Sequence, residues 1–156
     1  MESVKSTRMR QVIDAPRKRV FDALLEPSAI ARWKVPAGMT GRVHELDARE
    51  GGAIRVSLTY DAPDREGKTQ GRTDTYRGRF VRIVPDELVV EVDEFETDDP
   101  ALRGEMTTTI TLSDVDGGTE LVAVHDGLPE GLSLADNEAG WREALTRLAA
   151  LLQSPR

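Results

Sequence analysis

The stretch SLADNEAGWREALTRLAALLQ, residues 133–153, decides the fold of this 156-residue chain. Its large apolar side chains recur every three or four residues: Trp141, Leu145, Leu148 and Leu152. At about 100° per residue they fall within an arc of roughly 60°, which predicts one long amphipathic helix. Ser133 and Asp136 resemble a capping box at its start. Because such a helix is only marginally stable alone in water, it needs an apolar surface to lie on.

The preceding sequence is expected to supply that surface as a β-sheet. Residues 8–13 predict a strand, and residues 16–25 and 28–33 predict two short helices. From residue 41 onward the apolar spacing changes from helical to alternating. This pattern predicts strands at residues 42–48, 54–60, 73–84, 88–94, 106–112 and 119–125. Tight turns between them favour an antiparallel meander of about six strands. Gly78 is expected to mark a bulge or a close approach of the backbone.

The predicted fold class is therefore α+β, with a helix-grip layout in which a curved antiparallel sheet wraps around the C-terminal helix. Two short helices follow the first strand. We expect a single domain over residues 1–156, with its core at about residues 8–152. Because the ends of a curved sheet diverge from a straight helix, this layout tends to leave a space between the two.

Composition limits the possible partners. The chain has no cysteine, which excludes disulfides and thiolate metal ligands. Its net charge of -7, with Lys and Arg interspersed among acids, disfavours nucleic-acid binding. No stretch approaches the roughly 20 apolar residues of a membrane span, and the N-terminal residues MESVK lack a signal-peptide core. A cytoplasmic protein without nucleic-acid or membrane partners is expected.

Several segments carry a resemblance to a known family. They are RQVIDAP (10–16), VFDAL (20–24), IARW (30–33) with Pro36, DAREGG (47–52), GRFVRIVP (78–85), HDGL (125–128) and Gly140-Trp141. In order and spacing they resemble the SRPBCC (START/Bet v 1-like) superfamily. Within it they are most similar to the bacterial group related to the activator of heat-shock protein 90 ATPase. The resemblance runs from about residue 8 to residue 152.

The resemblance implies a function as well as a fold. It implies a small-molecule-binding protein that holds an apolar or amphipathic ligand between sheet and helix, with no cofactor. One alternative is an enzyme of the cyclase or hydrolase type that uses the same cavity. Another is an interaction module that contacts a chaperone, as the family name implies.

Strand register predicts which side chains line the cavity. The expected lining is Trp33, Ile54, Val56, Leu58, Tyr60, Tyr76, Phe80, Val92, Glu94, Leu121, His125, Trp141 and Leu145. Glu94 and His125 are the candidate catalytic pair, because an imidazole beside a carboxylate serves as a general base or a ligand anchor. Tyr76 is a further polar candidate. The alternative is that Glu94 and His125 lie at strand ends and reach solvent, or that a bulge turns either outward.

Other motifs predict no chemistry. Residues 62–69 (APDREGKT) fit a loose phosphate-binding pattern, but the residues that follow are strand-like, whereas that mechanism requires a helix. His44 and His125 are far apart in sequence and show no metal-ligand spacing. Gly140, inside the predicted helix, costs about 1 kcal/mol relative to alanine, which suggests tight packing or room for a ligand.

Overall fold

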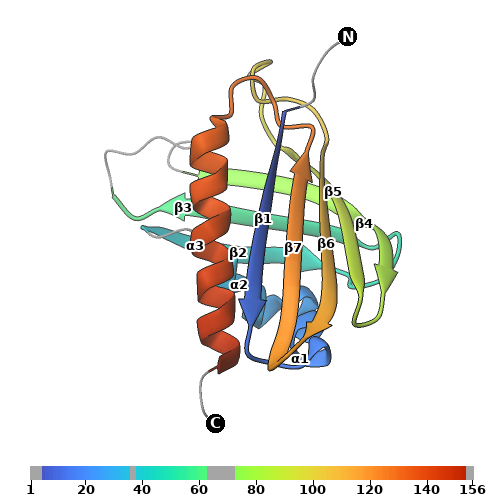
Figure 1. Cartoon of the computed structure of the whole chain (residues 1–156). Coiled ribbons are helices and arrows are strands. Elements are labelled where there is room, and N and C mark those ends of the chain that lie inside the picture. The colour runs from blue at the N-terminus through green and yellow to red at the C-terminus, as the bar shows by residue number, and fades with distance from the viewer. Residues whose placement is uncertain (1–4, 36–37, 63–72, 154–156) are drawn as a thin grey trace.

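A computed structural model of the chain describes residues 5–35, 38–62 and 73–153. Strand β1 (Ser6–Ile13) is followed by two short helices, α1 (Arg17–Leu25) and α2 (Pro27–Trp33). The remaining strands are β2 (Met39–Leu46), β3 (Ala53–Tyr60), β4 (Thr73–Val84), β5 (Leu88–Phe95), β6 (Met106–Val115) and β7 (Gly118–Asp126). The long helix α3 (Leu134–Gln153) ends the described chain (Figure 1). Most of the APDREGKT motif lies outside the described residues.

The strands form one curled antiparallel sheet in the order β1-β7-β6-β5-β4-β3-β2, and α3 lies on its concave side (Figure 1). The predicted helix-grip fold is confirmed. Within the described residues the sheet has seven strands, which are residues 6–13 together with the six strands expected after residue 41. The bulge in β4 lies between Phe80 and Arg82, so of the two roles expected for Gly78 the bulge is not the one observed. Pro16 is the residue before α1, in an extended conformation, whereas Pro27 begins α2.

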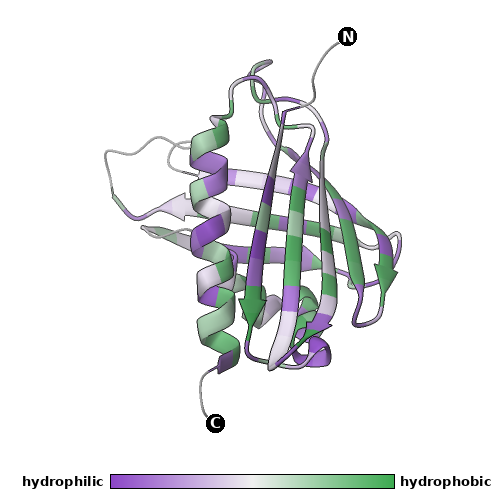
Figure 2. Ribbon diagram, viewed as in Figure 1, coloured by the Kyte–Doolittle hydropathy of each residue, from purple (hydrophilic) through white to green (hydrophobic). Residues whose placement is uncertain are grey.

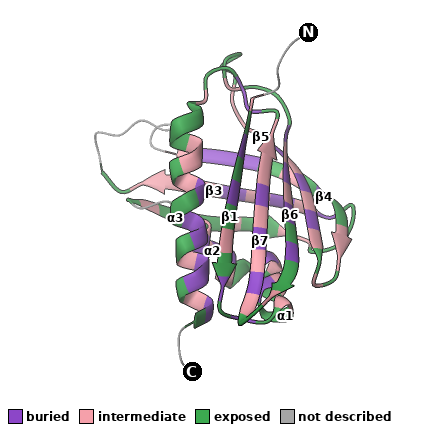
Figure 3. Ribbon diagram, viewed as in Figure 1, coloured by how far each residue is buried: buried purple, intermediate pink, exposed green. Residues whose placement is uncertain are grey.

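Helix α3 begins as its sequence predicts and divides into two halves. The Ser133 hydroxyl accepts a hydrogen bond from the Asp136 backbone N–H at 3.2 Å, which caps the first turn. All its buried residues come later: Trp141, Ala144, Leu145, Leu148, Ala149 and Leu152. None of residues 134–140 is buried (Figure 3). No helix of the described residues is long and apolar enough to cross a membrane.

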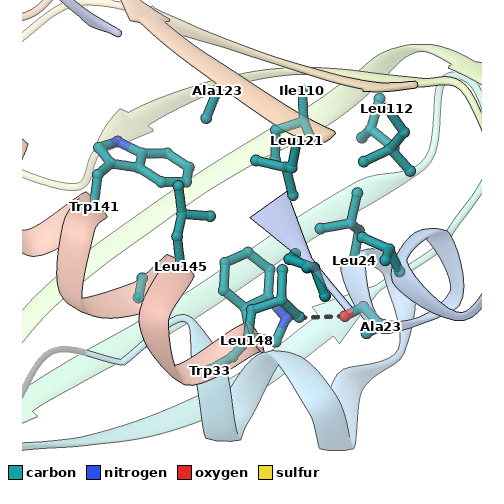
Figure 4. Close-up of a cluster of buried hydrophobic side chains, with 14 of the residues drawn as sticks. Ala23, Leu24, Trp33, Ile110, Leu112, Leu121, Ala123, Trp141, Leu145 and Leu148 are labelled. Atoms are coloured by element: carbon teal, nitrogen blue, oxygen red, sulfur yellow. Dashed lines mark hydrogen bonds between the residues drawn. The ribbon is translucent and has the colours of Figure 1, made fainter. Parts of the chain in front are cut away.

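The C-terminal half of α3 packs into a dry hydrophobic core. Leu148 and Leu121 are fully buried there, beside Trp33 (Figure 4). The Trp33 indole N–H donates to the Ala23 carbonyl at 2.9 Å, so its one polar atom is satisfied inside the core. The strands around this core alternate between apolar and polar residues (Figure 2). The stripe of α3 predicted to face the sheet does so.

We expect Leu145→Ala to destabilise the protein by roughly 2–5 kcal/mol, because it leaves a cavity in a close-packed core. Leu145 is 1% exposed. Leu134→Ala is the matched control on the same helix, since Leu134 is 41% exposed and should change stability by about 0.5 kcal/mol or less. Urea unfolding measures both. Equal effects of the two substitutions would contradict the described packing of α3.

Candidate functional site

Strand β5 turns two acidic side chains toward the interior. Its buried residues are Val89, Glu91 and Asp93. The register expected from the sequence, which pointed Val92 and Glu94 inward, is therefore wrong by one residue. Consecutive apolar residues at 88–90 are compatible with either register, and the rule that charges face water favours the wrong one. The inward acids are stabilised by a partner from another part of the chain.

Glu94 instead lies on the outer face of the sheet. Its carboxylate contacts Arg77 of β4 at 3.2 Å, and its side chain is 36% exposed. Val92 and Glu94 both line a pocket of about 300 Å³ on this outer face, together with Arg55 and Arg79. The expected catalytic pair of Glu94 and His125 is thus not assembled, because the two side chains lie on opposite faces of the sheet.

The partner of the inward acids is Lys34, the residue after α2. Its ammonium lies 3.3 Å from the Glu91 carboxylate, with the two side chains 18% and 7% exposed. Burial alone would lower the pKa of Lys34, but the charges of Glu91, Tyr76 and Asp93 and the hydrogen bond with Glu91 together outweigh it, so the pKa is raised. Burial likewise opposes ionisation of Glu91, whereas Lys34 and a hydrogen bond from Asp93 lower its pKa. The two groups form a buried ion pair.

Asp93 beside this pair behaves in the opposite way. Burial, the Glu91 charge and their shared hydrogen bond raise its pKa well above the usual value, although Lys34 opposes them. Asp93 is therefore the protonated member of the acid pair. Gly78 on β4 makes room for it: a Cβ at that position would lie 2.1 Å from Asp93 Oδ1 and from the Val92 carbonyl oxygen. The close approach expected at Gly78 is confirmed.

Tyr76 reaches the same region from β4, as expected. The Lys34 ammonium lies 5.6 Å from the centre of its ring, in a cation–π contact. Burial raises the pKa of the Tyr76 hydroxyl, and the nearby Lys34 charge only partly offsets this, so the hydroxyl stays protonated. Lys34 acts on it chiefly through charge, because its ammonium makes no hydrogen bond of good geometry to the hydroxyl oxygen.

His125 faces inward from β7 and is held in one tautomer. Its Nδ1 accepts a hydrogen bond from the Trp141 indole N–H at 3.1 Å, and the Asn137 amide nitrogen lies 3.3 Å from it. The Thr7 hydroxyl donates to Asn137 Oδ1 at 2.6 Å, which orients the amide nitrogen toward the imidazole. Because Nδ1 is an acceptor, the proton of the neutral ring is on Nε2. Burial, then the Lys34 charge, lower the pKa of His125 to about 4.

The other expected lining residues differ in how far they are buried. Seven are buried on the concave side: Trp33, Ile54, Val56, Phe80, Leu121, Trp141 and Leu145. Leu58 and Tyr60 are half-buried at the end of β3. Sequence reasoning missed Lys34, Glu91, Asp93 and Asn137. Two acids at alternate positions of a valine-rich strand are a signal that could have identified Glu91 and Asp93. Asn137, a polar residue one turn before Trp141 on α3, could have been identified in the same way.

Two pockets of the described residues lie outside this interior. One is the outer-face pocket, and the other adjoins the Asp14–Pro16 turn and the β6–β7 hairpin. The concave side is filled by side chains over the C-terminal half of α3. Beside Gly140, in contrast, a Cβ would meet no atom within 4 Å, which excludes tight packing as the reason for this glycine.

A protein-family model described as "Activator of Hsp90 ATPase homolog 1-like protein" matches residues 14–153, most of the chain. The chain belongs to this family. The chain is 35% identical to a protein from Chromobacterium violaceum whose crystal structure has been solved. The two structures superpose with a TM-score of 0.86, and the match covers 96% of this chain and 98% of that one.

Two more distant structures share the fold. A protein from Arthrobacter aurescens is 20% identical, with a TM-score of 0.79 and coverage of 98% and 92%. One from Mycobacterium smegmatis is 19% identical, with a TM-score of 0.75 and coverage of 99% and 98%. A comparison with curated proteins finds no match.

We expect His125 to be neutral at pH 6, with its proton on Nε2, and to titrate near pH 4. Because this folded-state pKa lies below the ordinary 6.5, the imidazole stabilises the fold above pH 6.5 and that contribution is lost as the pH falls toward 4. The raised pKa of Asp93 changes stability with pH in the opposite direction, so a stability curve would not isolate the contribution of His125. The protonation of the imidazole is therefore followed directly by nitrogen-15 NMR. A His44→Gln variant assigns the signals. A midpoint at or above 6.5 would contradict the described burial of His125.

Proposed function

We propose that this family member is a cytoplasmic small-molecule-binding protein that holds an apolar or amphipathic ligand between the sheet and the first half of α3. The main support for this proposal is that the interior has two unlike parts. Over the C-terminal half of α3 it is dry and close-packed, which serves stability. Near the first half it holds Lys34, Tyr76, Glu91, Asp93 and His125, a concentration of polar groups that folding alone does not require.

The first two turns of α3 are the segment that would move to let a ligand enter the interior. None of residues 134–140 is buried, so moving them exposes little core. Gly140 lies one turn before the buried Ala144 on the same side of the helix, and the space at its missing side chain is open. The fold of this family commonly binds hydrophobic ligands. Together these features support a ligand position next to Gly140 and Trp141.

A second candidate function is an acid–base enzyme that uses the same interior. The opposite pKa directions of Glu91 and Asp93 favour it, because a protonated acid beside an ionised one is how proton-transfer sites are built. The residues of this candidate are Asp93, Glu91 and Tyr76, in place of the expected pair of Glu94 and His125.

We expect the neutral fluorescent probe N-phenyl-1-naphthylamine to bind the wild type, and Gly140→Leu to weaken binding about tenfold or more by filling the open space. The helix should tolerate leucine, which has the higher helix propensity. Ala139→Leu is the matched control on the exposed side of α3 and should bind as the wild type does.

Native mass spectrometry of freshly purified protein complements the titration, since a retained apolar compound would support the proposal directly. Absence of probe binding, or equal weakening by both leucine variants, would contradict the proposed location. Chemical change of a retained or added compound on incubation would favour the enzyme candidate.

A further inference from the structure

Two buried side-chain atoms of the described residues have no hydrogen-bond partner, and both belong to the inward polar groups. They are the Tyr76 hydroxyl oxygen and Asp93 Oδ1. A buried polar group without a partner costs about 1–3 kcal/mol. Two such atoms in one place therefore indicate a position at which a further molecule completes the hydrogen bonding.

The two groups are neighbours on the concave face of the sheet. In the pairing of β4 with β5, Tyr76 lies opposite Phe95 and Gly78 lies opposite Asp93. Tyr76 and Asp93 are therefore diagonal neighbours, and Gly78, the residue of β4 opposite Asp93, has no side chain. The Asp93 carboxyl occupies the room that a side chain at position 78 would fill. One small functional group can thus contact both residues.

The hydrogen-bonding roles of the two groups differ. Lys34, the charged neighbour of Tyr76, has only N–H donors, so the Tyr76 hydroxyl cannot donate to it and keeps its proton for another acceptor. The Asp93 carboxyl shares its single proton with Glu91 and is then left with acceptor capacity alone. The site therefore presents one donor and one acceptor side by side.

The charges around the site favour a neutral group. Lys34 and Glu91 already neutralise each other in their ion pair. A ligand carboxylate would add a second negative charge beside Glu91, and a ligand ammonium would add a second positive charge beside Lys34. Either charge would be buried without a free partner, at a large cost.

We propose that the polar end of the ligand is a neutral hydroxyl group, as in an apolar alcohol or phenol, which accepts a hydrogen bond from Tyr76 and donates one to Asp93. The inference rests on the proposed function and names its ligand class. The apolar body of the molecule would contact the Trp141 ring and the first half of α3.

The test compares three naphthalenes of nearly equal size by isothermal titration calorimetry at pH 7: 2-naphthol, 2-methylnaphthalene and 2-naphthoate. Two neutral hydrogen bonds should make the wild type bind 2-naphthol about tenfold more tightly than 2-methylnaphthalene. We expect 2-naphthoate to bind more weakly than 2-naphthol.

Variants assign the preference to the two residues. Tyr76→Phe and Asp93→Val should each reduce it to about twofold or less. Asp93→Asn should retain it, because an amide donates to Glu91 and accepts from the ligand as a protonated carboxyl does. Glu94→Gln, on the outer face of the sheet, is the matched control and should bind as the wild type does.

The outcomes separate the two proposals. If none of the three compounds binds the wild type, the proposed function fails. If 2-naphthol and 2-methylnaphthalene bind equally, or 2-naphthoate binds most tightly, the hydroxyl inference fails while the proposed function stands. Loss of the preference in Asp93→Asn would overturn the role given to the Asp93 proton. The wild-type comparison is decisive even if a variant does not fold.

Discussion

The interior of this protein depends on the buried ion pair between Lys34 and Glu91. Two isolated charges at this depth would be prohibitively costly, and a pair replaced by apolar residues is often no less stable. What the pair provides is a fixed electrostatic setting. Burial and then the Glu91 charge raise the pKa of Asp93, and burial and then the Lys34 charge lower the pKa of His125. Both shifts favour the neutral forms of these neighbours, so the site presents uncharged hydrogen-bonding groups beside a neutralised ion pair.

Stability and function are divided along one helix. The second half of α3 contributes Leu145 and Leu148 to a dry core, and that core holds the sheet and the helix together. The first half contributes Asn137, which together with Trp141 at the boundary between the two halves fixes the tautomer of His125. Because residues 134–140 bury little, the polar part of the interior can open without unfolding the rest.

The sequence alone predicts the fold well, because each of its main signals is local. The spacing of Trp141 and the leucines that follow identifies one face of α3, and alternation identifies the strands. The inward position of His125 follows from the same alternation. The site could not be predicted in full, because Lys34 meets Glu91 from a distant part of the chain. Without that partner, inward acids on β5 contradict the usual pattern, and Glu94 is the more natural choice.

The two tryptophans report on the two halves of the interior. The Trp141 indole donates to His125 in the polar part, whereas the Trp33 indole donates to Ala23 in the dry core. The most direct measurement is therefore the nitrogen-15 NMR shift of both indole N–H groups during titration with 2-naphthol. We expect the Trp141 signal to move saturably while the Trp33 signal stays in place. Movement of Trp33 alone, or of neither signal, would contradict a ligand site beside the first half of α3.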